Sequence, residues 1–440
     1  MNYYTLLKKH CVAVPDKLLI RCDDEVLTYG DMLALADELA KGINQWVQPT
    51  KPILIISEDP VYQAGSFLAV EKLGAIPVLM HNGCKNDIVE RILSENNFFG
   101  LWLIGKNHNN FRIWHSSGTD HQIEGAVMGA LTSGSTGTPK VMYRSFASWA
   151  GFFTQQNDVF RIDGNCIMFI QGSMSFTGNL NIFMGVLAAG GSVITCCKIS
   201  ARHWTGFIQK NNATHIYMVP AKLQLLWRKG PNDNKAVKCI IAGSQLFDEE
   251  NWEGLVKTFP KAEIILYYGS GELSYISYRH LTGGDIEYNN LGRPFEGIKV
   301  FSEDGNLFVD TPFHINGIEM PYCCGDTGYV NHSGEIIFTG RKTDWINKGG
   351  YKISAIKLEQ QIGKLDGVQD VVVLPYADKH RGQEIAAFVV LKDGLTAGGL
   401  RRYFSTCLDE RERPKKIVVL DNLPLNDRGK VDKELLKEYI

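Results

Sequence analysis

Ten residues, Leu131 to Lys140, combine hydroxyl groups, glycines and one lysine directly after an apolar run. Glycine lets the backbone approach an anion closely, and successive N–H groups can form an anion-binding nest. The candidate polyphosphate ligands are Thr132, Ser133, Gly134, Ser135, Thr136, Gly137 and Lys140. The same composition is also typical of a flexible surface loop, and the segment lacks the Gly-Lys-Ser/Thr ending of a Walker loop.

A second polar group follows another apolar run and comprises Tyr268, Gly269, Ser270, Gly271 and Glu272. A carboxylate at a strand end beside phosphate groups suits Mg²⁺, because this cation prefers oxygen ligands and shares them with phosphate. Glu272 is therefore the candidate metal ligand. The alternative is that Glu272 is a solvated surface carboxylate.

Two further motifs lie toward the carboxyl end of the sequence. Asp326 follows Cys324-Gly325, and Arg341 comes fifteen residues after it. A fixed carboxylate is a good acceptor for a vicinal diol such as that of ribose, although Gly-Asp-x-Gly alone is also typical of a turn. The last motif, Asn426 to Lys430, places a lysine in a polar loop. A point charge on a flexible stem can stabilise charge that develops at phosphorus.

The elements that must position these residues alternate between strands and helices through the first 270 residues. Ile53–Ile56 is predicted to be a buried strand, and Asp59-Pro60 offers an N-cap and a first-turn proline. Further strands are predicted at 76–80, 166–170, 215–219, 239–242 and 264–268. The alternation predicts an α/β fold with largely parallel sheets flanked by helices, whose ligands bind at the carboxyl ends of the strands.

The pattern changes after about residue 285, where glycines and prolines punctuate short strands. A chain of 440 residues also exceeds one compact core. We predict a large amino-terminal domain at 1–341 with a β-rich subdomain at about 286–340, a hinge at 342–345, and a mobile α+β domain at 346–440. In this last domain, helices are predicted at 354–362 and 400–408, and strands at 371–374, 385–391 and 416–420.

Composition argues against several classes of protein. A net charge of −2 gives no electrostatic reason to expect nucleic acid or an anionic membrane as a partner. No apolar run approaches the ~20 residues of a spanning helix, and the first residues do not follow the pattern of a secretion signal. The ten cysteines show no zinc-ligand spacing. We expect a cytoplasmic protein with reduced cysteines and no membrane span.

Taken in order, the motifs resemble those of the adenylate-forming superfamily, which includes acyl-CoA synthetases, carrier-loading adenylation domains and luciferases. The first segment is similar to its phosphate loop, Tyr268 to Glu272 to its Tyr-Gly-x-Thr-Glu element, and Gly243-Ser244 to its adenine-binding loop. The matches run from about residue 27 to residue 433, and the type most similar is an AMP-forming acyl-CoA synthetase.

The resemblance implies a two-step reaction, in which a carboxylate attacks the α-phosphate of Mg·ATP and a thiol then displaces AMP from the acyl-adenylate. Thr136 and Lys140 would hold the departing pyrophosphate, while Lys430 would bridge the carboxylate and the α-phosphate. Ribose would bind Asp326 and Arg341. The carboxy-terminal domain would then rotate and bring the Gly349-Gly350 turn to the site.

Two positions depart from the family pattern. Gly271 stands where threonine is usual, which removes a hydroxyl expected near the α-phosphate. The hinge residue of the family is usually Asp or Lys and corresponds here to Thr343, with Asp344 adjacent. Both departures bear on whether the chain is active.

The acid-binding region of the family corresponds to Phe176, Thr177 and Gly178. Members that activate amino acids place an aspartate after an aromatic residue there, so Thr177 favours a fatty, short-chain or aryl acid. Phe176 can equally be a wall residue. CoA is the expected thiol, and the phosphopantetheine arm of an acyl carrier protein is the alternative. A non-catalytic nucleotide-binding homologue is the remote alternative.

Overall fold

The structure, a computed structural model, describes most of the chain. The residues outside the description are 83–85, 115–122, 124, 132–138, 198, 230–234, 244–246, 248, 284–286, 342–343, 350, 379–380, 393–394 and 427–429. The chain divides into two compact units. The large unit contains Met1–Tyr288, Gly292–Lys299 and Asp310–Met320, and the small unit contains Asn289–Leu291, Val300–Val309 and Pro321–Ile440.

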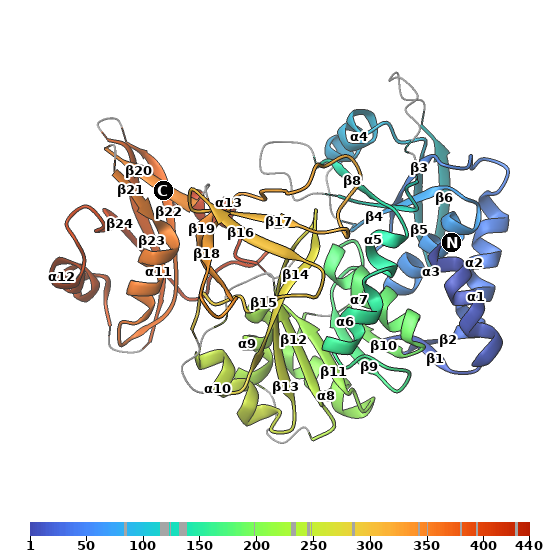
Figure 1. Cartoon of the computed structure of the whole chain (residues 1–440), viewed down its shortest axis with the longest axis horizontal. Coiled ribbons are helices and arrows are strands. Elements are labelled where there is room, and N and C mark those ends of the chain that lie inside the picture. Colours follow the sequence, from blue (N-terminus) through green and yellow to red (C-terminus); the bar gives the residue numbers. More distant parts are fainter. Residues whose placement is uncertain are drawn as a thin grey trace. The chain divides into compact units, whose positions relative to one another are not determined.

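A nine-stranded sheet of order β15-β14-β13-β12-β11-β9-β10-β1-β2 runs through the large unit (Figure 1). The strands from β13 to β1 are parallel, whereas β14, β15 and β2 pair in antiparallel fashion, and β15 and β2 are the two edges. The strands are β1 (Leu18–Cys22), β2 (Glu25–Thr28), β9 (Ile167–Gln171), β10 (Ser192–Cys196), β11 (His215–Met218), β12 (Cys239–Gly243), β13 (Glu263–Ser270), β14 (Ser274–Leu281) and β15 (Arg293–Pro294).

A second sheet of the large unit has six strands in the order β6-β5-β3-β4-β7-β8. Strands β5, β3, β4 and β7 are parallel, and β6 and β8 are antiparallel edges. The strands are β3 (Pro52–Ile56), β4 (Ile76–Met80), β5 (Gly100–Gly105), β6 (His108–Ile113), β7 (Met128–Leu131) and β8 (Val141–Arg144). Every residue of β3 and β4 is buried, as expected for apolar strands inside a parallel sheet.

Helix α3 (Pro60–Lys72) contacts β1 of the nine-stranded sheet and β3, β4 and β5 of the six-stranded sheet. It begins as predicted, because the Asp59 side chain accepts a hydrogen bond from Val61 N and Pro60 occupies the first turn. Small and apolar residues lie on all its sides, which is the pattern of a helix enclosed between layers. The other helices of the large unit are α1 (Tyr3–Ala13), α2 (Tyr29–Ile43), α4 (Asn86–Glu95), α5 (Ala147–Ala150), α6 (Phe153–Val159), α7 (Thr177–Ala189), α8 (Ala201–Lys210), α9 (Pro220–Lys229) and α10 (Glu249–Thr258).

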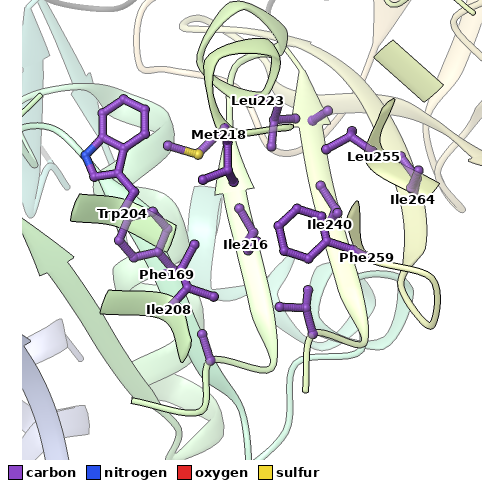
Figure 2. Packing of buried hydrophobic residues seen from close by; sticks show 14 of the residues in the cluster. Phe169, Trp204, Ile208, Ile216, Met218, Leu223, Ile240, Leu255, Phe259 and Ile264 are labelled. Carbon is purple, nitrogen blue, oxygen red and sulfur yellow. The ribbon is translucent and has the colours of Figure 1, made fainter. Parts of the chain in front are cut away.

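One hydrophobic core of the large unit joins the nine-stranded sheet to α8, α9 and α10 (Figure 2). Its buried members include Phe169, Ile216, Ile240 and Ile264 from the strands and Trp204, Ile208, Leu223 and Leu255 from the helices. Each fully buried side chain of this kind contributes about 1.5–3 kcal/mol. The packing fixes the strand ends that carry the candidate site.

The small unit contains a four-stranded sheet of order β16-β17-β18-β19 and a five-stranded sheet of order β21-β20-β23-β22 in which β24 pairs with β23. The strands are β16 (Lys299–Glu303), β17 (Asn306–Asp310), β18 (Asp326–Val330), β19 (Ile336–Arg341), β20 (Trp345–Lys348), β21 (Tyr351–Ser354), β22 (Val368–Asp378), β23 (Gly382–Leu391) and β24 (Lys416–Leu420). The helices are α11 (Ala355–Gly363), α12 (Ala397–Cys407) and α13 (Lys433–Lys437). Leu358, Phe404 and Val389 pack in its core.

The predicted α/β fold with a carboxy-terminal α+β part is confirmed. The sequence pattern missed the antiparallel edges, because β2, β6 and β8 are short and are not uniformly apolar. The boundaries at 1–341, 342–345 and 346–440 stay a prediction, and contacts group most of residues 300–340 with the carboxy-terminal residues. Among the described residues, no helix is long and apolar enough to cross a membrane.

Candidate active site

The predicted phosphate loop joins β7 to β8, which pair as an antiparallel hairpin. Thr132, Ser133, Gly134, Ser135, Thr136 and Gly137 lie outside the described residues. Lys140 is described and exposed. The side chain of Asn96 holds the backbone on both sides of this lysine, since Nδ2 donates to Pro139 O at 3.0 Å and Oδ1 accepts from Val141 N at 2.9 Å. The sequence motifs gave no role to Asn96.

Glu272 lies in the turn between the antiparallel strands β13 and β14. Leu273 N donates to Ser270 Oγ at 3.2 Å, and Ile315 N donates to the Glu272 carbonyl at 2.9 Å. In the described part of the chain, the half-buried Glu272 carboxylate makes no hydrogen bond or ion pair. A carboxylate on a fixed backbone with both oxygens available fits a hard cation such as Mg²⁺.

The two glycines of this turn differ in what surrounds them. The register of the β13–β14 pairing shifts between Tyr268 and Gly269. A Cβ on Gly269 would lie 2.2 Å from the Ser274 carbonyl oxygen, so this position has no room for a side chain. A Cβ on Gly271 would lie 2.8 Å from Met142 Cε. The buried Met142 side chain therefore occupies space that a larger residue at 271 would need, which gives a physical reason for this departure from the family.

A buried arginine of β8, Arg144, supports the same turn. Its Nη2 donates to Gly271 O at 2.6 Å, while Nη1 donates to Ser148 Oγ at 3.1 Å and to Phe313 O at 3.2 Å. Burial lowers the pKa of Arg144 to about 10, and the nearby Glu272 charge opposes this shift. Arg144 thus stays cationic at neutral pH. Two of its three partners, Gly271 and Phe313, are more than a hundred positions away, so the sequence motifs did not reveal it.

Gly243, the predicted adenine contact, is the last residue of β12. Ser244 lies outside the described residues. A Cβ on Gly243 would lie 2.3 Å from Tyr267 Cε1, so the glycine backbone packs directly on that ring. The Tyr267 and Tyr217 hydroxyls are 2.5 Å apart. Burial is the main cause that raises the pKa of Tyr217, so this hydroxyl stays protonated.

The predicted acid-binding residues lie at the start of α7, with Phe176 before the helix and Thr177 and Gly178 in its first turn. A Cβ on Gly178 would lie 2.2 Å from Tyr217 Oη. The paired tyrosine hydroxyls therefore lie between the acid-binding segment and Gly243. The Phe176 ring is 6.0 Å from the ring of His81.

The loop before Phe176 is anchored by the buried Gln63 of α3. Its Nε2 donates to Ser173 Oγ and its Oε1 accepts from Met174 N, both at 2.8 Å. The interaction joins residues more than a hundred positions apart. The sequence therefore carried no local signal for it.

The predicted ribose ligands, Asp326 and Arg341, are brought together in the small unit. They are register partners on β18 and β19, and Arg341 Nε donates to Asp326 Oδ1 at 2.7 Å. The Asp326 side chain is 1% exposed and that of Arg341 is 57% exposed. Cys324 Sγ donates to the second oxygen, Asp326 Oδ2, at 3.5 Å. The carboxylate is fixed in place by two neighbours.

The predicted thioesterification turn follows β20 in a tight hairpin, where Lys348 pairs with Tyr351. Gly349 has a φ of +60°, which favours glycine, and Gly350 lies outside the described residues. Gly349 N donates to Arg381 O at 2.8 Å.

A buried ion-pair network, missed by the motif analysis, lies beside this hairpin. Lys348 Nζ is 3.0 Å from Glu384 Oε2, and Arg381 Nη1 is 3.1 Å from Glu384 Oε1. The Lys348 and Glu384 side chains are both nearly inaccessible to solvent. The network fixes the strand that leads into the turn.

The predicted hinge and the terminal lysine lie in the same small unit. Thr343 is outside the described residues, and Asp344 Oδ1 lies 3.4 Å from Lys433 Nζ. Lys430 is exposed at the base of a loop closed by Asn426, whose Oδ1 accepts from Lys430 N at 3.1 Å. The asparagine of the predicted motif therefore orients the backbone of its lysine.

Two family models match the chain: AMP-binding enzyme over residues 124–313 and AMP-binding enzyme C-terminal domain over residues 357–430. The chain belongs to this adenylate-forming family of AMP-binding enzymes, and the sequence-based recognition is confirmed. The roles of individual residues stay predictions.

Relatives cover most of the chain. It is 26% identical to the Uncharacterized acyl–CoA ligase YhfT of Bacillus subtilis over 70% of this chain and 68% of the relative. It is 22% identical to Acetyl-coenzyme A synthetase 2 of Kluyveromyces lactis over 99% and 81%, respectively. ATP-bound MatB from Rhodopseudomonas palustris has the same fold, with a TM-score of 0.84 at 19% identity over 100% of this chain and 99% of that one.

Proposed function

We propose that this chain is an AMP-forming acid–thiol ligase that activates a carboxylic acid with ATP and then transfers the acyl group to CoA. The observation that carries the proposal is the turn at Glu272, in a chain of this family. Its backbone is held from β8 by Arg144, and its carboxylate oxygens are available for a cation. A homologue that only binds nucleotide could use the same carboxylate for Mg·ATP, so acid-dependent exchange is the measurement that separates the two.

Each predicted residue has a role in this proposal. Glu272 holds Mg²⁺, which neutralises phosphate charge when bound. Thr136 and Lys140, with the remaining hydroxyls and N–H groups of the phosphate loop, bind the leaving pyrophosphate. Asp326 and Arg341 bind the ribose, and Lys430 orients the acid carboxylate toward the α-phosphate. The Gly349-Gly350 turn serves the thiol step.

The acid is proposed to be fatty, short-chain or aryl. No carboxylate side chain is present at Phe176, Thr177 or Gly178 to pair with an α-amino group. The Tyr217 hydroxyl, which burial keeps protonated, lies against Gly178 and is paired with the Tyr267 hydroxyl. CoA is favoured as the thiol because the two curated relatives named above carry acyl–CoA ligase and acetyl-CoA synthetase names.

Acid-dependent exchange of pyrophosphate into ATP, measured over a panel of fatty, short-chain, aryl and amino acids, tests the first step. We expect exchange with at least one acid that lacks an amino group, and none with amino acids. Absence of exchange with every acid of the panel would favour the alternative of a non-catalytic nucleotide-binding homologue. Thioester formation with CoA, compared with holo carrier proteins, identifies the acceptor.

Substitution of Lys430 separates the two half-reactions. Lys430→Ala should suppress adenylation and spare thioester formation from supplied acyl-adenylate, because the ammonium acts at the α-phosphate. The exposed Lys437→Ala is a matched control that should leave both half-reactions unchanged. Survival of adenylation in Lys430→Ala would remove Lys430 from the proposed mechanism.

A further inference from the structure

A second cluster of chemically reactive side chains lies in the large unit, on segments to which the sequence motifs gave no role. Cys22 ends β1, Asp23 begins the turn to β2, and Cys197 directly follows β10. Strands β1 and β10 are parallel neighbours (Figure 1). The ligand atoms of these three residues all lie within 4.8 Å of one another.

The spacing of the two sulfurs matches a metal site. Cys22 Sγ and Cys197 Sγ are 3.7 Å apart. Two thiolates on a tetrahedral Zn²⁺ with Zn–S bonds of about 2.3 Å are separated by about 3.8 Å. A disulfide requires about 2.05 Å. The observed separation of the two sulfurs therefore fits two ligands of one Zn²⁺-type ion. A disulfide would require the sulfurs to move closer together.

The carboxylate is aimed at the same place by contacts on both of its oxygens. His203 Nε2 lies 3.0 Å from Asp23 Oδ1, and Cys197 N donates to Asp23 Oδ2 at 3.4 Å. Asp23 has a φ of +49°, a conformation that aspartate tolerates better than most residues. The His203 ring stacks on Phe207 at 5.8 Å, which fixes its orientation.

We propose that Cys22, Asp23 and Cys197 bind one thiophilic divalent cation of the Zn²⁺ class, with His203 as the positioning residue that orients the Asp23 carboxylate. A histidine on the outer oxygen of a ligating carboxylate is a common second layer of metal sites. Cys22 is buried and Cys197 is exposed, so the ion can enter from the solvent side and keep a coordination position for water. The ion would link the β1–β2 turn to the end of β10.

Four residues of this cluster are spread over 182 positions of the sequence, from Cys22 to His203, counting both ends. This spread explains why no ligand spacing was found in the sequence. Cys196 also lies within 4.8 Å of Asp23 and His203 through its ligand atom, but it is fully buried.

The test uses the reduced full-length chain after treatment with a chelator. Co²⁺ should bind one equivalent and give a thiolate-to-cobalt charge-transfer band, and Zn²⁺ should displace it. Cys22→Ser and Cys197→Ser should each weaken the band and lose the bound equivalent. His203→Ala should keep the band but lower the affinity about 10- to 100-fold. Cys11→Ser, on the separate helix α1, is the matched control and should bind as the wild type does.

A second measurement does not depend on the variants folding. In the wild-type chain, Zn²⁺ should slow alkylation of Cys22 and Cys197 together, as mapped by peptide mass spectrometry, and leave Cys407 unaffected. Absence of the charge-transfer band, or alkylation of both thiols at the same rate with and without Zn²⁺, would overturn the proposal. Neither readout depends on ligase activity, so it stands apart from the proposed function.

Discussion

The two units of the chain each support a turn of the proposed site with a buried cation, but they do so in different ways. Arg144 in the large unit donates to the neutral oxygens of Gly271, Ser148 and Phe313. Lys348 in the small unit is paired with the carboxylate of Glu384. A cation bound to neutral oxygens keeps its charge available to its surroundings, whereas an ion pair neutralises it. The first arrangement suits the proposed role of the Glu272 turn beside metal and phosphate, and the second fixes the backbone that leads into the proposed thioesterification turn.

The largest effect is expected where the ion pair is broken. Glu384→Gln leaves Lys348 buried without a charged partner, and breaking a buried pair in this way costs about 3–5 kcal/mol. We expect the free energy of unfolding of the small unit to fall by this amount, as measured by denaturant titration monitored at that unit. Loss of the thiol step should accompany it, because Gly349 follows Lys348 directly.

Two controls show whether the effect belongs to the buried pair. Arg381 is the second partner of Glu384, and its own side chain is 59% exposed. Arg381→Ala should therefore lower the free energy of unfolding by less than about 1 kcal/mol. The double variant Lys348→Met, Glu384→Leu removes both charges and should recover most of the loss. If Glu384→Gln were as stable as the wild type, Lys348 would be held by its other contacts alone.

The corresponding change in the large unit should affect activity more than stability. Arg144→Met relieves the cost of burying a cation but also removes the hydrogen bonds of the guanidinium. Because these effects oppose each other, the free energy of unfolding should change by only about 1–3 kcal/mol. The Glu272 turn loses its anchor, and a small displacement of a reacting group can lower the rate about 100-fold. We expect this loss in acid-dependent pyrophosphate exchange.

Arg144→Lys sharpens the comparison. It keeps the charge but cannot reproduce a planar group that donates to three acceptors, so it should recover only part of the rate. Equal exchange rates for wild type and Arg144→Met, at matched folded fractions, would show that the turn does not need the guanidinium.

A carboxyl that forms no ion pair with another described residue provides a third case. Half-buried Glu359 accepts a hydrogen bond from Val373 N at 2.8 Å, and burial raises its pKa from the ordinary 4.5 to about 7. The folded chain therefore keeps a proton that the unfolded chain releases above pH 4.5. The free energy of unfolding should fall as the pH rises from about 4.5 to about 7, by about 1–3 kcal/mol, and then level off.

Glu359→Gln tests this contribution, because glutamine can accept the same hydrogen bond but does not titrate. Its unfolding free energy should lack this slope, so the variant should gain over the wild type as the pH rises. Denaturant midpoints at a series of pH values measure the difference. Identical slopes for the two chains would mean that Glu359 is ionised in the folded state.

The sequence predicted those parts of the structure that depend on short segments. Apolar runs marked β3, β4 and β12, and the cap at Asp59 marked the start of α3. The spacing of Asp326 and Arg341 came from a family pattern, and the β18–β19 register explains it. The supports of the site were not predictable in this way. Arg144 and its acceptor on Gly271 are 127 positions apart, and only the completed fold brings them into contact.

The smallest effect is expected at Gly271, and it tests whether the family departure is a loss or an accommodation. A Cβ at 271 would lie 2.8 Å from Cε of Met142, so this flexible end of the side chain would have to shift. Gly271→Ala should therefore cost less than about 1 kcal/mol and leave pyrophosphate exchange within about threefold. The matched control is Gly269→Ala, two residues earlier, where the added Cβ would meet the Ser274 carbonyl at 2.2 Å and no side-chain movement can help. This control should unfold more easily by about 1–3 kcal/mol and lose exchange. Similar losses at both positions would mean that the whole turn, rather than the backbone at Gly269 alone, excludes side chains.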